Sequence, residues 1–589
     1  MFAASKASDM PLSASRKILK ILLTDFPLGL LQLTRIVVTG SVYNQFTTNE
    51  DQHEAYWKSR FGGKINPTLL DLKHLIYLDL SFNFFNFTPI PKFIGSMGSL
   101  RYLNLSNAGF GGLIPHQLGN LSNLQYLNLE GSYFNNLYVI NLQWLSGLPL
   151  LQHLDLSYAN LSKASNWLQE INKLPSLSEL RLSDCEHSGF IPPSIPNSIN
   201  FSSLTTLDLS YNSFENTSIL FWVFGLLNLV SLDLSNNQFQ GPIPVHLQNL
   251  TSLRHLDLSR NTFNSSIPNW LYSFSHLEFL NLGYNSLHGA ISSAIGNLTF
   301  AISIDLSYNE LEGKVPISLG NLSNLREITL LGNKWSQEVS EIFESLSGCV
   351  SNRLEILDLS NAKQFGQLTD ELGQFKNLVI LSLGYNSISG PIPLSIGNLS
   401  SLRSLYLESN QINGTATQNF GQLSKLRYLN IGLNILEGVV LEVHFANLMR
   451  LKTLIASQLT LEVSDNWTPS FQLNHLDLGS WNLWLKFPLW LCSQKQLLTL
   501  DISNTRILDA VPPSFWNLTS QLAYLNISPN QIYGEIPHIP MILSYFSIII
   551  DMNSNHFKGL LPCISSNVTF LDLSNNLLSR SISHFCVTR

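Results

Sequence analysis

The chain has 589 residues, a formal net charge of −7 and a charged fraction of only 12%. The low charge and the lack of a basic stripe exclude a nucleic-acid-binding surface, and a hydrophobic share of 44% excludes a disordered chain. The cysteines are scattered without a CxxC or a Cys/His cluster, so the sequence predicts no metal site, no cofactor and no dense disulfide framework.

Residues 1–65 form an atypical N-terminal segment, which we expect to be poorly ordered. The stretch at 18–38 places basic residues before an apolar run, as a signal peptide does, but Asp25 and Pro27 interrupt it and no clear cleavage site follows. The longest apolar stretch of the whole chain, ILFWVFGLLNLV at 219–230, is too short to cross a bilayer. The sequence therefore predicts neither a clear signal peptide nor a membrane span.

Residues 66–589 repeat one motif every 24 residues or so, as in LVSLDLSNNQFQGPIP at 229–244 and LRHLDLSRNTFNSSIP at 253–268. Self-similarity at this period predicts an α/β solenoid of stacked coils with one parallel, concave sheet. Matching strand starts from Leu78 to Leu571 gives about 21 coils. We expect the array to be open at its C-terminal end. A stack of coils has no enclosed cleft, which favours binding over catalysis.

The stretch LDLSNN at 232–237 alternates apolar and polar residues, which is typical of a short strand with one buried face. We predict that Leu232 and Leu234 face the core, while Asp233 and Ser235 face water. The turn after the strand is often written GxIP, as at 241–244. Glycine there supplies an unusual backbone conformation, and proline belongs off the main sheet. The rest of the coil is expected to be a short helical or irregular segment on the outer side.

An asparagine column follows the strands, three residues after the last leucine. A buried Asn carries two donors and an acceptor, so it can satisfy backbone groups where the chain bends. We interpret the column as structural. Its members are Asn83, Asn212, Asn237, Asn261, Asn285, Asn309, Asn333, Asn386, Asn410 and Asn434, followed by Asn530, Asn555 and Asn576.

The middle strand position is often aspartate, as in Asp208, Asp233 and Asp257. Paired carboxylates are what glycosidases use. A ladder that repeats in every coil is not the single distinctive pair in a pocket that catalysis requires. We therefore predict no catalytic residues and no enzyme.

Four successive coils replace this aspartate by Ser382, Tyr406, Asn430 and Ile455. Aromatic residues clustered on an exposed face are favoured anchors for a partner, although strand preference alone also favours tyrosine. The ligand-binding hypothesis names five residues on or beside these coils: Tyr385, Tyr406, Glu408, Tyr428 and Gln458.

About sixteen N-x-S/T sequons suit an extracellular glycoprotein. Asn104 and Asn526 fall within strands, where a glycan would obstruct a partner, so we expect low occupancy there. The glycosylation candidates are Asn86, Asn120, Asn160, Asn216, Asn249, Asn264, Asn297, Asn321, Asn398, Asn413, Asn517 and Asn567.

The repeat with GxIP is the plant-specific form of the leucine-rich repeat, and the chain resembles the ectodomain of plant leucine-rich repeat receptor-like proteins. The resemblance is strongest to the group that perceives fungal xylanase. It rests on AYWKSRFGGKINPTLLDLKHLIYLDLS at 55–81, NLQWLSGLPLLQHLDLSYANLSKASNWLQEINKLPSL at 141–177 and LPCISSNVTFLDLSNN at 561–576. The family's cap with paired cysteines is missing from residues 1–65. The further repeats and membrane span of the family do not follow, as expected of a truncated ectodomain.

The resemblance implies a non-enzymatic receptor at the cell surface, on the extracellular side of the plasma membrane. It would bind a microbial protein or peptide on the concave face and signal through a partner receptor kinase in plant defence. Two alternatives stay open: a secreted leucine-rich repeat inhibitor of a microbial cell-wall-degrading enzyme, and a nonfunctional or decoy fragment.

Overall fold

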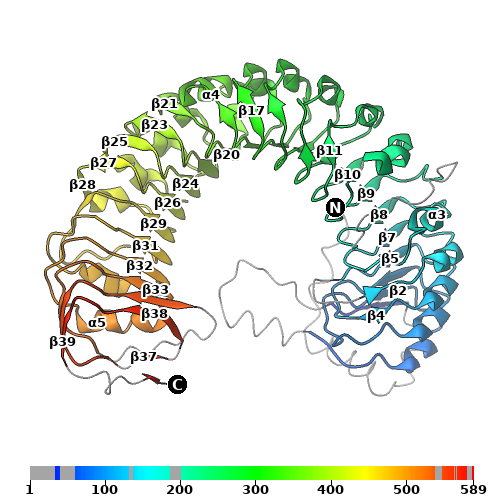
Figure 1. Ribbon diagram of the computed structural model, residues 1–589, viewed down its shortest axis with the longest axis horizontal. Helices are drawn as coiled ribbons and strands as arrows, with labels where there is room; N and C mark the ends of the chain where they lie inside the picture. The colour runs from blue at the N-terminus through cyan, green and yellow to red at the C-terminus, as the bar shows by residue number, and fades with distance from the viewer. Residues whose placement is uncertain are drawn as a thin grey trace. The chain divides into compact units, whose positions relative to one another are not determined.

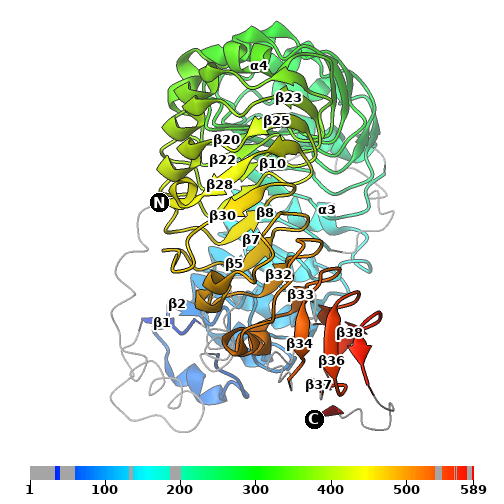
Figure 2. The same ribbon diagram turned by 90° about the vertical axis from the view of Figure 1, so that its left-hand side faces the viewer.

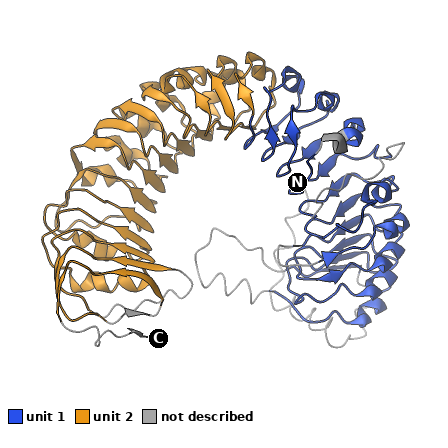
Figure 3. Cartoon of the chain, in the orientation of Figure 1, with its two compact units in different colours: residues 1–286 blue, residues 287–589 orange. Residues whose placement is uncertain are grey.

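The computed structural model describes residues 34–39, 60–131, 137–185, 200–215, 217–537, 547–562, 564–565, 567–579 and 587–588. The chain divides into two compact units, unit 1 over residues 1–286 and unit 2 over residues 287–589. Within each unit the strands of a parallel sheet lie on the inner side and short helices lie on the outer side (Figure 3).

The parallel sheet of unit 1 contributes one three-residue strand from each coil (Figure 1). Its strands are β1 (Arg35–Val37), β2 (Tyr77–Asp79), β3 (Tyr102–Asn104), β5 (Tyr126–Asn128), β7 (His153–Asp155), β8 (Glu179–Arg181), β9 (Thr206–Asp208), β10 (Ser231–Asp233), β12 (His255–Asp257) and β14 (Phe279–Asn281).

The parallel sheet of unit 2 is built in the same way (Figure 2). Its strands are β16 (Ser303–Asp305), β18 (Glu327–Thr329), β20 (Ile356–Asp358), β22 (Ile380–Ser382), β24 (Ser404–Tyr406), β26 (Tyr428–Asn430), β29 (Thr453–Ile455), β31 (His475–Asp477), β32 (Thr499–Asp501), β33 (Tyr524–Asn526), β35 (Ile548–Asp551) and β38 (Val568–Asp572).

Shorter strands follow many of the turns and pair in parallel in small sheets of their own. In unit 1 they are β4 (Gly112–Leu113), β6 (Leu137–Tyr138), β11 (Gln240–Gly241) and β13 (Thr262–Phe263). In unit 2 they are β15 (His288–Gly289), β17 (Glu310–Gly313), β19 (Lys334–Trp335), β21 (Phe365–Gln367), β23 (Ser387–Gly390), β25 (Gln411–Thr415), β27 (Ile435–Glu437), β28 (Val439–Leu441), β30 (Thr460–Glu462), β34 (Tyr533–Glu535), β36 (His556–Gly559), β37 (Ile564–Ser565), β39 (Leu577–Leu578) and β40 (Val587–Thr588).

Most coils close with a single 3₁₀ turn rather than an α-helix. The 3₁₀ helices of unit 1 are η2 (Pro67–Asp71), η3 (Lys92–Ser96), η4 (His116–Asn120), η5 (Gln143–Gly147), η6 (Thr217–Gly225), η7 (Val245–Asn249) and η8 (Asn269–Ser273). Those of unit 2 are η9 (Ser293–Asn297), η10 (Ile317–Asn321), η11 (Cys349–Asn352), η12 (Asp370–Gln374), η13 (Leu394–Asn398), η14 (Gln418–Gln422), η15 (Glu442–Phe445), η16 (Leu489–Ser493) and η17 (Thr519–Gln521). The short α-helices are α3 (Trp167–Ile171), α4 (Val339–Ser345) and α5 (Pro513–Trp516).

The leucine pattern places the core as predicted, with Leu229, Leu232 and Leu234 all fully buried. Burying each such side chain contributes roughly 1.5–3 kcal/mol. The prediction for Ser235 was wrong, because this residue is only 5% exposed. The chain has already begun to turn there, and the backbone N–H of Ser235 donates to the Asp233 carboxylate at 2.9 Å.

Over the two units, 22 strands have this parallel arrangement, which confirms the predicted solenoid. Of these, 21 match the expected coils, and the additional one is β1, in the segment that we expected to be atypical. Arg35, Ile36 and Val37 pair in register with β2, and Ile36 is 4% exposed. β1 therefore covers the apolar edge of the first predicted coil.

The residue just before the asparagine column adopts a left-handed backbone in most coils. Tyr211, Asn236, Arg260 and Tyr284 have φ between 51° and 54°. A non-glycine residue there stores of order 1–3 kcal/mol of strain, which the surrounding coil must hold in place. The predicted glycine conformation at the GxIP turn is also observed, with φ of 80° at Gly241.

Candidate functional site

The outward face of the parallel sheet is the candidate binding site. Each three-residue strand leaves its first and third side chains on that face. Equivalent residues of successive coils pair in register, so these side chains form two columns along each unit. Around the predicted binding residues, the first column runs through Ser404, Tyr428 and Thr453, and the second through Ser382, Tyr406, Asn430 and Ile455.

Aspartate and asparagine in the second column stabilise the turn after each strand. The Oδ1 atom of Asp233 accepts from the N–H of Ser235, two residues on. The same bond is made as far along the chain as Asp572, and asparagine makes it equally well at Asn281. Its recurrence gives the row of aspartates a structural explanation.

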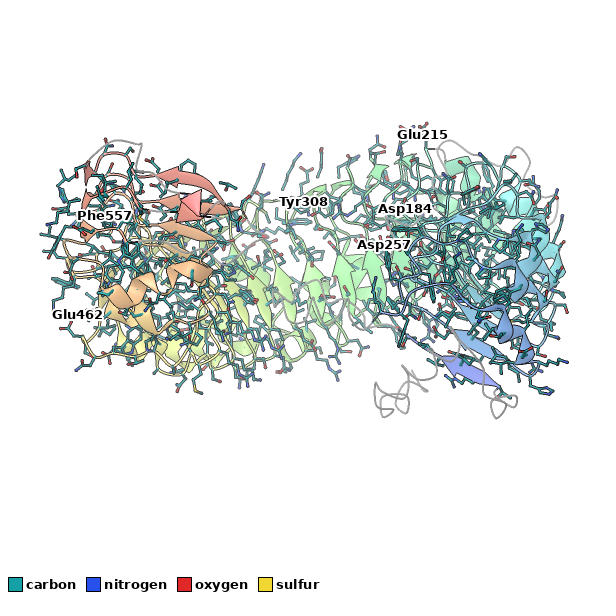
Figure 4. The ribbon with its side chains drawn as sticks, turned by 90° about the horizontal axis from the view of Figure 1, so that it is seen from below. Asp184, Glu215, Asp257, Tyr308, Glu462 and Phe557 are labelled. Carbon is teal, nitrogen blue, oxygen red and sulfur yellow. The ribbon has the colours of Figure 1, made fainter. Side chains whose placement is uncertain are left out.

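Three aspartates of unit 1, Asp208, Asp233 and Asp257, pair in register as neighbours. Figure 4 labels Asp257. Burial raises the pKa of the central Asp233 to about 6, and the charges of Asp208 and Asp257 add to the effect. This stretch of the sheet therefore concentrates negative charge, and ionisation of the Asp233 carboxyl group opposes folding.

Four of the five predicted binding residues lie on three adjacent coils of unit 2, and we call Tyr385, Tyr406, Glu408 and Tyr428 the tyrosine cluster. Tyr385 is 59% exposed and Tyr428 is 41% exposed. Burial raises the pKa of Tyr406. A hydrogen bond with Ser404 lowers this pKa, whereas the nearby Tyr428 and Glu408 raise it further. Tyrosine has no oxygen that can replace the aspartate of the turn, so Tyr406 gives up that local bond.

Glu408 has an unsatisfied acceptor inside the tyrosine cluster. Its carboxylate lies against the backbone of Gly384, where an added Cβ would come within 2.8 Å of the Glu408 carboxyl carbon. Burial raises the pKa of Glu408, and its Oε2 atom is buried without a hydrogen-bond partner in the described part of the chain. An unpaired buried oxygen favours a ligand that brings a donor.

Gln458, the fifth predicted residue, lies one coil beyond Tyr428. Like Tyr385, it occupies the left-handed position that follows the strand, with φ of 64° against 56° at Tyr385. Both side chains are exposed. The backbone N–H of Tyr385 donates to the carbonyl of Glu408 at 2.8 Å, which ties Tyr385 to the cluster, whereas no described hydrogen bond joins Gln458 to it.

The sequence reasoning missed an aromatic stack on the first column of unit 1. The rings of Tyr77, Tyr102, Tyr126 and His153 lie parallel, with successive centroids 3.8, 4.2 and 4.0 Å apart. The guanidinium of Arg35 lies 4.3 Å from the Tyr77 centroid and covers the outer end. The signal was present as YL or HL at one strand position of four successive coils. The inner rings cover one another's faces, so they offer edges and hydroxyl groups, not stacking surfaces, to a partner.

Charged residues close the other end of this aromatic stack. His153 Nδ1 lies 2.7 Å from Glu179 Oε2, and Arg181 lies 2.7 Å from Glu179 Oε1. The hydrogen bond with His153 is the main cause that lowers the pKa of Glu179 to about 2. The stacking of the rings and these ion pairs fix the side chains of this row, although His153 Nε2 is buried without a hydrogen-bond partner among the described residues.

The asparagine column uses its polar atoms on the backbone. Asn237 Nδ2 donates to the carbonyls of Leu209, Leu234 and Ser235 at 3.0–3.1 Å, and its Oδ1 accepts from the N–H of Phe214 at 3.2 Å. Backbone carbonyls and a backbone N–H are likewise bound by Asn83, Asn212, Asn261, Asn285, Asn309, Asn333, Asn386, Asn410 and Asn434.

Most glycosylation candidates are accessible on the outer side. Asn120, Asn249, Asn297, Asn321 and Asn398 each end a 3₁₀ helix and are exposed. Asn86, Asn264, Asn413 and Asn517 are exposed as well, Asn160 and Asn567 are half-buried, and Asn216 lies outside the described residues.

We expect no glycan at the two strand sequons. The amide of Asn526 donates to Asp501 at 2.9 Å and its Oδ1 accepts from Ser528, while Asn104 accepts from the N–H of Ser106. Peptide mass spectrometry of the secreted chain should find glycans on Asn120 and Asn249 but none on Asn104 or Asn526. Full occupancy at Asn526 would contradict this prediction.

Two kinds of feature, a membrane-spanning helix and a metal-binding cluster, are not found among the described residues. None of the described helices is long and apolar enough to cross a membrane. Within the described ranges, no group of three or more His, Cys, Asp or Glu side chains could hold a metal ion.

The fold is shared with known proteins. The Leucine rich repeat family matches residues 202–263, 227–287 and 352–412. The chain is 38% identical to the receptor-like proteins EIX1 and EIX2 of Solanum lycopersicum, over 90% and 89% of its length. It spans about half the length of these relatives, 51% of each. The crystal structure of PEPR1-AtPEP1 matches with a TM-score of 0.61 and 30% identity, over 90% of this chain and 76% of that one.

These matches confirm the resemblance to receptor-like proteins that the sequence motifs indicated. The parallel strands, the asparagine column and the matched segments all indicate a leucine-rich repeat. The chain belongs to the leucine-rich repeat family, and its relatives are plant receptor-like proteins.

Proposed function

We propose that this chain is the recognition part of a plant cell-surface receptor-like protein. It binds a microbial protein or peptide on the parallel sheet of unit 2, and the bound receptor signals through a partner receptor kinase in plant defence. The cell-surface location, the kinase partner and the defence role come from the resemblance to receptor-like proteins. The chain acts by binding and carries out no catalysis of its own.

The observation that carries this proposal is the tyrosine cluster. Two of its tyrosines are well exposed, and they stand beside a carboxylate with a buried, unpaired oxygen. Exposed tyrosines are enriched among the residues that contribute most to binding, and an unpaired acceptor beside them favours a partner that brings a donor. The solved relative PEPR1-AtPEP1 is, by its name, a complex, which supports a binding function for this fold.

The test is binding of a purified fungal xylanase, the ligand that the resemblance suggests first. We expect the double substitution Tyr406→Ala with Tyr428→Ala to weaken binding by at least about tenfold, since hot-spot tyrosines contribute about 2 kcal/mol or more. The melting temperature should stay close to that of the parent, because both side chains lie on the outward face of the sheet and neither is fully buried. Surface plasmon resonance and thermal unfolding measure the two quantities.

Tyr533→Ala is the matched control. Tyr533 is 47% exposed on β34 in the same unit, but it lies off the parallel sheet. We expect this variant to bind as the parent does. If the double variant also kept its affinity for a ligand that the parent binds, the tyrosine cluster would not be the binding site.

A further inference from the structure

A pocket of about 520 Å³ lies in unit 2, away from the outward columns of the parallel sheet. The end of β30, the loop at 483–488 and the start of η16 form its walls. Figure 2 shows β28 and β30, which are paired, in this part of the unit. The volume falls in the range of small-ligand sites.

The walls of the pocket combine apolar surface with acid groups. Trp484 is 57% exposed and Leu489 is 54% exposed, whereas Phe487 and Trp490 are almost fully buried beneath them. Three carboxylates, those of Glu462, Asp465 and Asp509, face a single cation, Lys486. The pocket is therefore both apolar and negatively charged.

The three carboxylates that line the pocket differ in their hydrogen-bond and ion-pair partners. Lys486 pairs with Asp465 at 3.1 Å, and Asp509 accepts from the backbone N–H groups of Phe487 and Ala510. Glu462, labelled in Figure 4, has no ion-pair partner in the part of the chain that the structure describes. Its carboxylate is exposed and available to a cation.

Charge and shape together select the class of ligand. The carboxylates would repel an anion. A neutral apolar group would shield the carboxylates from water without giving them a hydrogen-bond or ion-pair partner, which is unfavourable. An arginine or lysine side chain has an aliphatic stem for the apolar wall and a charged head for Glu462. A tryptophan face also attracts such a cation.

The surface beside the pocket favours a peptide over a free amine. Leu441 of β28 pairs in register with Glu462, and Val439, Leu441 and Val443 are 38–45% exposed. This strip of exposed aliphatic side chains leads to the pocket from the neighbouring coil. It fits the apolar residues that flank a basic residue in a peptide.

We propose that this pocket binds an arginine or lysine side chain, flanked by apolar residues, of a peptide or protein partner. The site is separate from the tyrosine cluster and does not depend on the proposed function. Substitution of Tyr406 should therefore leave binding at this pocket unchanged.

The experiment uses the glycosylated full chain and two probes, acetyl-Leu-Arg-Leu-amide and the same peptide with neutral citrulline in place of arginine. We expect calorimetry to show the arginine peptide binding about tenfold more tightly, as one charge-assisted pair implies. Glu462→Gln should remove most of this preference, and Trp484→Ala should weaken the arginine peptide. Glu312→Gln, at an exposed glutamate on β17, is the matched control and should have no effect.

Two results would overturn the proposal. One is equal affinity for the two peptides, or an arginine preference that Glu462→Gln leaves intact. The other concerns Asn466, an exposed sequon residue next to Asp465. If the arginine peptide binds only after Asn466→Gln, the chain's own glycan covers the pocket and no peptide partner uses it.

Discussion

Replacement of Asn237 by alanine is expected to lower the free energy of unfolding of its coil by about 2–4 kcal/mol. The side chain donates to three backbone carbonyls and accepts from the N–H of Phe214, all in an interior where it is only 7% exposed. Alanine removes all four of these bonds: the N–H of Phe214 loses its Asn237 acceptor, and the carbonyls of Leu209, Leu234 and Ser235 keep one donor each, from Asn212, Asn261 and Tyr211. Each buried polar group left unpaired costs roughly 1–3 kcal/mol.

Native-state hydrogen exchange on the full chain measures this effect coil by coil. Faster exchange is expected for the coils on either side of Asn237, because a solenoid is stabilised mainly by neighbouring contacts. Asn236→Gly is the matched control: the adjacent residue is half-buried, has φ of 51°, and loses backbone strain when glycine replaces it. Equal exchange in Asn237→Ala and the parent would show that the column is not needed for stability.

The regular part of this fold could be predicted from sequence because it depends on local spacing. The leucines, the asparagine column and the turn glycine recur at fixed positions, and each contact joins a coil to the next. The role of the aspartates could not be predicted in the same way. Asp233 accepts a hydrogen bond from the N–H of Ser235, two residues on, and the sequence shows only that the aspartate recurs, not that it makes this bond.

The features that break the repeat were harder to predict. β1 pairs with β2 across more than 40 residues and has no leucine pattern of its own. The stack of Tyr77, Tyr102 and Tyr126 is visible only when successive coils are aligned by strand position. The pocket beside Glu462 draws on several coils, and its shape depends on the loop at 483–488, whose backbone includes left-handed residues at Trp484 and Leu485.

Replacement of Asp233 by asparagine is expected to stabilise unit 1 by about 1–3 kcal/mol near neutral pH. The folded pKa of Asp233 is about 6, raised by burial and then by Asp208 and Asp257, against an unfolded value near 3.9. A difference of this size corresponds to at most about 3 kcal/mol. Asparagine keeps the acceptor for the N–H of Ser235, as Asn281 does for Gly283 in its own coil.

The sign of the pH dependence distinguishes ionisation from packing. The folded state holds the Asp233 proton more tightly, so parental stability falls as pH rises from about 4 to about 6 and levels off above that. The gain from Asp233→Asn should therefore be full near pH 7 and vanish near pH 4 in urea titrations at both values. Asp305→Asn is the control, because Asp305 pairs in register with Thr329 rather than with another carboxylate on that side, and it should give little gain at either pH. An equal gain from Asp233→Asn at both pH values would mean that the charge of the aspartate row does not oppose folding.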